Sequence, residues 1–351
     1  MEENMLKKVA ILAVVASSLA FAKPNVVVLA TGGTIAGSGV SSTQYEGYQA
    51  AVTGVEKLLA AVPELKNIAS VSGEQVAQVA SQDMSTDVWL KLAKRVNHLL
   101  QQENVDGVVI THGTNTMEET AYFLNLVVKS KKPVVMVGAM RPGTAMSADG
   151  PMNIYNGVLA AGSKDSIGKG VMVVLNDRII SARDIQKTDT ITVDTFKAPI
   201  FGYLGQVVDG KVVFFKNPIN KHTYESEFDV TNITKLPKVD INYGYANDSG
   251  VVIDALVANG TKGIVHAGAG TASMSEFVLP SVEKATKKGI AIVRTPRTSL
   301  GMIGHNMEVD DDKYGTIAGG TLSTPKARVL LMLGLTKSND PKYLQELFFK
   351  Y

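Results

Sequence analysis

Residues 25–37 read Asn-Val-Val-Val-Leu-Ala-Thr-Gly-Gly-Thr-Ile-Ala-Gly, an apolar run that stops abruptly at two glycines flanked by threonines. A second run of this kind, at residues 108–114, reads Val-Val-Ile-Thr-His-Gly-Thr. Further apolar runs and stretches of helical periodicity alternate along the chain, at 54–61, 86–102, 134–137 and 171–175. Nearly continuous apolar strands that alternate with helices are typical of a parallel sheet covered on both faces. The sequence therefore predicts an α/β fold whose polar side chains gather where the strands end.

The character of the chain changes between Lys211 and Leu236, where a polar connection with Asn, Pro and Lys replaces the apolar runs. A second α/β unit begins near Val239, with strands expected at 263–267 and 290–294 and closing helices at 325–336 and 341–349. A chain of 351 residues is also long enough for about two domains. We therefore expect a larger N-terminal α/β domain with a mainly parallel sheet at 23–215, a linker at 216–237 and a smaller C-terminal parallel-sheet domain at 238–351.

The first 22 residues have the three regions of a secretory signal peptide: a basic start, an apolar run at 9–19 and the small-x-small site Ala20-Phe21-Ala22. The apolar run is too short to span a bilayer. Two glutamates near the start fit poorly in a basic leader, which leaves Met1 and Met5 as alternative start residues. We expect the mature protein to begin near Lys23, to be periplasmic or secreted, and not to reside in a membrane.

The composition excludes several classes of function. Lys plus Arg is 35 and Asp plus Glu is 33, and the resulting net charge of +2 gives no electrostatic reason to bind nucleic acid. The absence of cysteine excludes disulfides, thiol nucleophiles and thiolate metal sites. Neither nucleotide-binding glycine pattern occurs, and the histidines are scattered without metal-ligand spacing, at His98, His112, His222, His266 and His305. We therefore expect no metal and no organic cofactor.

Two loops place threonines directly after a strand. In Thr31-Gly32-Gly33-Thr34 the paired glycines allow a tight turn whose backbone N–H groups could hold an oxyanion near the Thr34 hydroxyl. A plain strand-to-helix turn is the alternative, and the motif alone favours it. The loop at 111–120 places Thr111, Thr114 and Thr116 around a glycine, and its Glu118-Glu119 pair suits a helix N-terminus. His112 is interpreted as structural because no acid partner or serine motif accompanies it.

Five collinear motifs together resemble the bacterial type II L-asparaginases, which include the periplasmic asparaginase and glutaminase-asparaginase enzymes. They are Ala-Thr-Gly-Gly-Thr-Ile-Ala-Gly at 30–37, Ile-Thr-His-Gly-Thr at 110–114, Gly-Ala-Met-Arg-Pro at 138–142, Ser-Ala-Asp-Gly at 147–150 and Pro-Lys-Ala-Arg-Val-Leu at 325–330. The resemblance covers essentially the whole mature chain. It implies the asparaginase fold and hydrolysis of the side-chain amide of L-asparagine to L-aspartate and ammonia. It also implies a homotetramer, a dimer of intimate dimers with active sites shared between subunits.

The resemblance assigns roles position by position. Thr34 would be the nucleophile, Tyr48 on the following loop would help to activate it, and Glu308 would arrive from the neighbouring subunit to bind Tyr48 and the substrate amine. A threonine hydroxyl is a poor nucleophile until a neighbour takes its proton. The resemblance therefore implies that these three side chains meet in an assembled site.

A second set of residues is implied for the remainder of the substrate. Thr114 and Lys187 match the family's second Thr–Lys–Asp group, whereas the pattern around Lys187 alone favours a solvated surface position. Ser81 and Gln82 match the residues that bind the substrate α-carboxylate and amine. An amino-acid substrate brings both a cation and an anion, so its site needs partners for each.

Two positions depart from the family pattern. Asn115 stands where the family has the aspartate that pairs with the substrate ammonium and with Lys187. A charge-assisted hydrogen bond contributes about 1.5–3 kcal/mol against about 0.5–1.5 for a neutral one, so binding should weaken by on the order of 1–2 kcal/mol. Ser273, in Gly-Ala-Gly-Thr-Ala-Ser at 268–273, replaces the second asparagine of Gly-Asn-Gly-Asn. A smaller change is Arg-Thr-Pro-Arg at 294–297, where Arg-Ser-Ser-Arg is common.

Three hypotheses therefore compete. The first is an L-asparaginase weakened by Asn115 and Ser273. The second is an amidohydrolase with a shifted preference, for L-glutamine, D-asparagine or an amide that lacks a free amine. The third is a catalytically impaired homologue that binds an amino acid or only assembles.

Overall fold

The computed structural model describes residues 23–44, 46–298 and 300–351. The predicted signal peptide at 1–22 lies outside the described residues.

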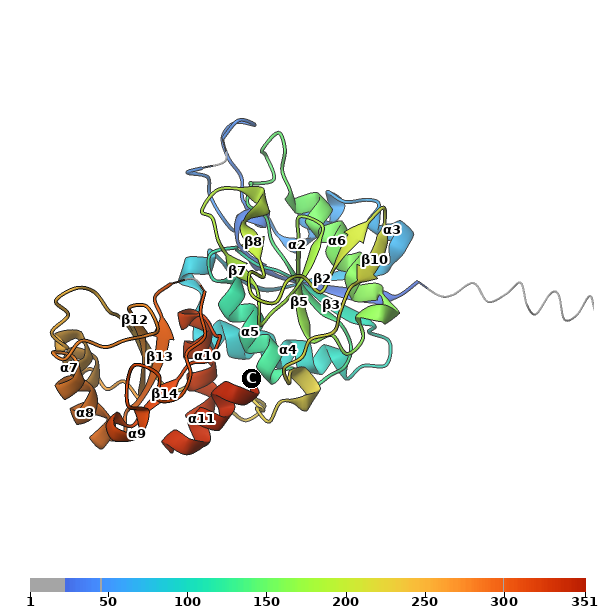
Figure 1. Ribbon diagram of the computed structural model, residues 1–351. Helices are drawn as coiled ribbons and strands as arrows, with labels where there is room; N and C mark the ends of the chain where they lie inside the picture. The colour runs from blue at the N-terminus through green and yellow to red at the C-terminus, as the bar shows by residue number, and fades with distance from the viewer. Residues whose placement is uncertain (1–22, 45, 299) are drawn as a thin grey trace, which may run out of the picture.

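The larger sheet has eight strands in the order β10-β9-β6-β5-β4-β3-β1-β2 (Figure 1). Five of them are parallel neighbours: β1 (Asn25–Gly32), β2 (Ser70–Val79), β3 (Gly107–Thr111), β4 (Val134–Val137) and β5 (Val171–Leu175). Antiparallel pairing extends the other edge through β6 (Arg178–Ser181), β9 (Gly205–Val208) and β10 (Lys211–Phe214). The expected mainly parallel sheet is confirmed. The polar connection expected from Lys211 was placed too early, because residues 211–214 pair with β9 as an edge strand.

Helices cover both faces of this sheet. Alternate residues of one strand point to opposite faces, so Val108 and Ile110 of β3 pack with α4 (Thr86–Leu100) and α5 (Met117–Val127). Val109 packs on the other side, where the apolar cluster includes residues of α2 (Val55–Ala60), α3 (Leu65–Ile68) and α6 (Gly150–Gly162). Every residue of β3, β4 and β5 is buried, which explains their nearly continuous apolar sequences.

The smaller sheet has four parallel strands in chain order: β11 (Val239–Tyr243), β12 (Gly263–Gly268), β13 (Ala291–Pro296) and β14 (Thr316–Ala318). One face packs against α7 (Val251–Ala258) and α8 (Leu279–Lys287). The other packs against α10 (Thr324–Gly334) and α11 (Pro341–Lys350), while α9 (Asp311–Tyr314) leads into β14. The predicted second parallel sheet is confirmed.

The two sheets meet through a continuous apolar cluster. Helix α10 packs against α5 of the larger sheet as well as against β12, and Figure 1 shows α10 between the two sheets. A short hairpin, β7 (Gln186–Lys187) with β8 (Phe196–Lys197), lies beyond the end of β6. Short 3₁₀ turns lie at Thr34–Ala36, Ser81–Asp83, Lys164–Ser166, Val193–Thr195 and Thr223–Glu225.

Candidate active site

The loops that follow β1 and β3 touch one another through glycines. Gly33 has a φ of 83°, and a Cβ added there would lie 2.3 Å from the Cα of Gly113. A Cβ added at Gly113 would in turn lie 2.6 Å from the Oγ of Ser81. Any larger side chain at either position would push the loops apart. The two threonine loops therefore form one surface at the carboxyl ends of adjacent strands.

Thr34 begins the 3₁₀ turn after β1, and its hydroxyl contacts a phenol. The Thr34 Oγ1 and the Tyr48 hydroxyl lie 2.5 Å apart, and the Thr34 residue is only 8% exposed. Burial raises the pKa of Tyr48; the hydrogen bond from Thr34 opposes this rise, and the carboxylates of Glu46 and Asp149 add to it. The phenol is therefore protonated at neutral pH, and the two hydroxyls can exchange a proton directly.

A second polar group is built around Lys187. Its Nζ donates to Thr114 Oγ1 at 3.0 Å and to Asn115 Oδ1 at 2.8 Å. Partial burial lowers the pKa of Lys187, while the charge of Glu46 opposes that change. The interpretation of Lys187 as a solvated surface residue is wrong, because the β7–β8 hairpin places it against the loop after β3.

Ser81 links the loops of this region. Its Oγ accepts a hydrogen bond from the backbone N–H of Asn115 at 3.1 Å, and its carbonyl accepts one from Thr116 Oγ1 at 2.7 Å. Ser81 is buried, whereas Gln82 beside it is exposed. Both residues lie in the 3₁₀ turn that follows β2.

Ser273 and Glu308 form a separate pair on the smaller sheet. Ser273 Oγ donates to Glu308 Oε2 at 3.3 Å, and Glu308 is exposed. Among the described residues, no hydrogen bond or ion pair joins this pair to Thr34, Tyr48 or Lys187. Within one chain the predicted site residues therefore fall into two groups, one on each sheet.

Two family models match the chain over most of its length. The model described as "Asparaginase, N-terminal" matches residues 25–220, and that described as "Glutaminase/Asparaginase C-terminal domain" matches residues 238–348. The chain belongs to the asparaginase family. It is therefore an amidohydrolase, as the sequence predicts.

Individual relatives agree with this membership. The L-asparaginase 2 of Bacillus subtilis is 52% identical, over 93% of this chain and 87% of that protein. The probable periplasmic L-asparaginase of Haemophilus influenzae is 50% identical, over 93% of this chain and 92% of that protein. The crystal structure of a probable cytoplasmic L-asparaginase from Campylobacter jejuni has a TM-score of 0.91 at 50% identity, and covers 94% of this chain and 100% of that one.

In this asparaginase-family chain the loop residues that support the site were only partly foreseen. Asp149, within the Ser-Ala-Asp-Gly motif, accepts from the backbone N–H groups of Met140 and Arg141 at 3.0 Å each. It thereby fixes the loop after β4. Its negative charge also helps to raise the pKa of Tyr48. Glu46, which influences both Tyr48 and Lys187, belongs to no motif that the sequence singled out.

The Glu118-Glu119 pair holds the two sheets together in this asparaginase-family fold. Lys326 Nζ lies 3.6 Å from Glu118 Oε2, and Arg328 Nη1 lies 3.7 Å from Glu119 Oε2. Lys326 is fully buried and also donates to the carbonyls of Arg183 and Ile185. Burial raises the pKa of Glu119 to about 7, against the opposing charge of Arg328. The Pro-Lys-Ala-Arg-Val-Leu motif therefore fastens α10 to α5 and to the segment just before Lys187.

His112 has the surroundings of a structural residue. Its ring is fully buried, its Nδ1 lies 2.7 Å from the Gly113 carbonyl, and burial lowers its pKa to about 4. Within the described part of the chain, no cluster of three or more His, Asp or Glu side chains is arranged to hold a metal ion. No helix there has the length and apolar character needed to cross a membrane.

Proposed function

We propose that this protein hydrolyses the side-chain amide of L-asparagine to L-aspartate and ammonia, with Thr34 as the nucleophile. The observation that carries the proposal is the 2.5 Å contact between Thr34 Oγ1 and the Tyr48 hydroxyl, at the end of a buried strand. The relatives named L-asparaginase support the same substrate.

The chemistry follows from the protonation state of Tyr48. Burial raises the pKa of this phenol, so Tyr48 is protonated before the reaction and cannot keep an additional proton. It must therefore donate its own proton as it accepts another. It takes the Thr34 proton and gives its own to the amide nitrogen as the Thr34 oxygen bonds to the carbonyl carbon. Ammonia then leaves, and water hydrolyses the resulting ester to L-aspartate. Backbone N–H groups near Thr34 would stabilise the oxyanion, and the Gly33 N–H is not among them because it donates to the Val79 carbonyl at 3.1 Å.

The remaining residues would bind the amino-acid end of the substrate. Ser81, Gln82 and Asn115 lie on the side of the site formed by the larger sheet. Lys187 and Thr114 form a second proton-transfer pair, in which burial of Lys187 lowers its pKa and favours the neutral amine. This group can activate the water of the second step.

Ser273 and Glu308 would complete the site from another subunit, where Glu308 would bind the substrate α-amine. In this proposal the protein is a homotetramer, a dimer of intimate dimers, and each active site combines the larger-sheet group of one subunit with the Ser273–Glu308 pair of its partner. The absence of a hydrogen bond or ion pair between the two groups among the described residues of one chain supports this arrangement.

An amidohydrolase with a shifted preference is the second candidate, and Asn115 is the observation that favours it. Asn115 Oδ1 already accepts a hydrogen bond from Lys187, so it offers the substrate ammonium no charge. Asparagine in place of the family's aspartate at position 115 would weaken binding of a substrate without a free amine less than it weakens binding of L-asparagine.

We also propose that the protein is exported, with residues 1–22 as its signal peptide. The three-part pattern of that segment supports the proposal, and so does the name of the Haemophilus influenzae relative. The Campylobacter jejuni protein is named cytoplasmic, so the names of the relatives include both compartments.

An assay of ammonia release from four amides tests the function. L-asparagine, L-glutamine, D-asparagine and succinic acid monoamide are compared at equal enzyme concentration. We expect the highest kcat/KM on L-asparagine. A higher value on the monoamide would support the shifted-preference candidate instead, and binding by calorimetry without ammonia release from any amide would contradict both.

Mixed subunits test whether the site is shared. Thr34→Ala removes the nucleophile from one half of the site, and Glu308→Ala removes the carboxylate from the other. After dissociation and reassembly together, some sites receive an intact half from each variant. We expect the mixture to release ammonia faster than either parent alone. A mixture no faster than the sum of its parents would contradict a shared site.

A further inference from the structure

Ser273 and Glu308 lie in two loops, outside the helices and strands of the smaller domain. The Ser273 loop (269–275) follows β12, and the Glu308 loop (303–309) precedes α9. Ala272, Asn306 and Glu308 have φ values of 59°, 58° and 63°, in the left-handed region. Residues with a Cβ remain in this region only where the surrounding structure holds them there. Hydrogen bonds within the loops, such as that from the Ser273 N–H to the Ala269 carbonyl at 2.9 Å, fix part of this geometry. Contacts from outside the loops are needed to fix where the two loops lie relative to each other.

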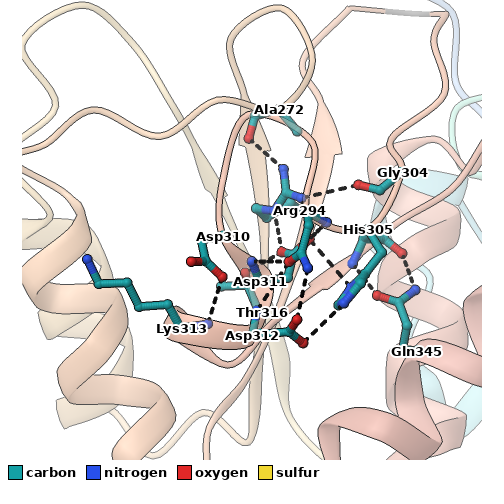
Figure 2. Close-up of polar contacts among 12 residues, drawn as sticks. Ala272, Arg294, Gly304, His305, Asp310, Asp311, Asp312, Lys313, Thr316 and Gln345 are labelled. Atoms are coloured by element: carbon teal, nitrogen blue, oxygen red, sulfur yellow. Dashed lines mark hydrogen bonds and ion pairs between the residues drawn. The ribbon is translucent and has the colours of Figure 1, made fainter.

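One buried side chain reaches both loops. Arg294 on β13 donates from Nε and Nη2 to the two oxygens of Asp311, at 2.7 Å and 2.6 Å, and both side chains are fully buried. Its remaining donors face the carbonyls of Ala272 at 3.4 Å and Gly304 at 3.5 Å. Figure 2 shows Arg294 between these two carbonyls and Asp311. A single guanidinium therefore connects the Ser273 loop, the Glu308 loop and α9.

Asn306 fastens the Glu308 loop to the same carboxylate. Its backbone N–H donates to Asp311 Oδ2 at 2.8 Å, and its side-chain Oδ1 accepts from the backbone N–H of Asp311 at 2.8 Å. Its Nδ2 donates to Asp312 at 2.8 Å. A small apolar cluster of Ala272, Ile303 and Ala318 joins the bases of the two loops.

Stability alone does not account for this arrangement. Buried ion pairs can often be replaced by apolar residues of similar volume without loss of stability. Apolar side chains could not bind the two loop carbonyls, and they could not accept the Asn306 backbone N–H. The polar contacts fix the positions of the loops. Apolar packing alone would allow the loops to take several positions.

We propose that Arg294, Asp311 and Asn306 form a loop clamp that positions Glu308 and Ser273 for the α-amine of the substrate. These three are positioning residues, since none of them contacts the Ser273–Glu308 pair through its own side chain. The inference rests on the proposed function, in which Glu308 meets the substrate amine.

The test uses Asn306→Gly, because Asn306 is exposed and glycine tolerates its positive φ. The variant loses only the side-chain half of the clamp. We expect KM for L-asparagine to rise about 5-fold with kcat changed less than about 2-fold, and kcat/KM for succinic acid monoamide to stay within about 2-fold. Equal losses on both amides, or no change on either, would overturn the clamp.

Asn247→Gly is the matched control. Asn247 is also exposed, has a φ of 67°, and makes no side-chain hydrogen bond to the described residues. It should leave both substrates unchanged. Arg294→Lys keeps the charge but loses the two-pronged geometry, and it should change the substrate ratio in the same direction as Asn306→Gly. If Arg294→Lys does not fold, Asn306→Gly decides alone.

Glu308→Gln separates failure of the clamp from failure of the proposed function. It should lower kcat/KM for L-asparagine more than for the monoamide, and Asn306→Gly should add little in that background. If Glu308→Gln shifts the ratio and Asn306→Gly does not, the clamp alone is wrong. If Glu308→Gln leaves the ratio unchanged, Glu308 does not bind the amine, and the clamp fails together with the role of Glu308 in the proposed function. Hydrolysis of L-asparagine itself is then still tested by ammonia release.

Discussion

Thr34→Ala should lower kcat for L-asparagine by on the order of 10³-fold or more, because covalent catalysis needs the hydroxyl it removes. The structure supplies a reason beyond the motif. Thr34 Oγ1 contacts the Tyr48 hydroxyl at 2.5 Å, so under the proposed mechanism its loss removes both the nucleophile and the first group of the proton relay. Ammonia release under saturating substrate measures the effect, and analytical ultracentrifugation should show unchanged assembly.

Two further variants control for this result. Thr34→Ser keeps a hydroxyl and should retain much more activity than Thr34→Ala. Thr31→Val removes a buried hydroxyl three residues earlier, which donates to the Thr111 carbonyl at 2.8 Å. It should lower the free energy of unfolding by about 1 kcal/mol while kcat stays within a few-fold. If Thr34→Ala keeps more than about a tenth of the wild-type kcat, which corresponds to about 1.4 kcal/mol, Thr34 is not the nucleophile.

Local pattern predicted most of the parallel core. Strands β3, β4 and β5 are buried along their whole length, so their side chains are apolar on both faces and the runs are plain in the sequence. Strand β10 was missed because an edge strand carries alternate exposed residues and is bordered by polar turns. Its pairing with β9 depends on the tertiary structure and cannot be predicted from the four residues alone.

Long-range polar pairs were beyond the sequence for the same reason. Glu118 was expected only to begin a helix, yet it lies beside the buried Lys326 more than two hundred residues later. Arg294 attracted notice only as part of a variant motif, although it is fully buried against Asp311. The partners of such an ion pair are far apart in the sequence and are brought together only by the tertiary fold. The hydrophobic periodicity of a segment carries no information about such contacts.

The contact between Thr34 and Tyr48 followed from family resemblance and not from spacing. The glycine turn alone favoured an ordinary loop, since a hydroxyl after a strand has no chemistry without a partner. Tyr48 lies on a loop without helical or strand periodicity, so nothing in its own neighbourhood indicates that it folds back over Gly37.

Asn115→Asp should raise kcat/KM for L-asparagine by about 10-fold or more, which is about 1.4 kcal/mol or more of transition-state stabilisation. Asn115 Oδ1 now accepts from Lys187 and has no charge for a substrate ammonium. A carboxylate of the same size can bind the ammonium and Lys187 together, with charge-assisted hydrogen bonds. Succinic acid monoamide has no ammonium, so its kcat/KM should rise much less.

The pH dependence separates the two ways in which the introduced carboxylate could act. Burial lowers the pKa of Lys187 in the present protein, and a carboxylate at hydrogen-bond distance would raise that pKa because it favours the charged amine. If neutral Lys187 is the base, activity rises with pH through this pKa, so the acid limb of the kcat profile should move to higher pH in Asn115→Asp. Equal gains on both amides would assign the effect to the Thr114–Lys187 pair instead of the ammonium. A loss on every amide would mean that Asn115 suits another ligand, and the proposal of L-asparagine as substrate would then fail.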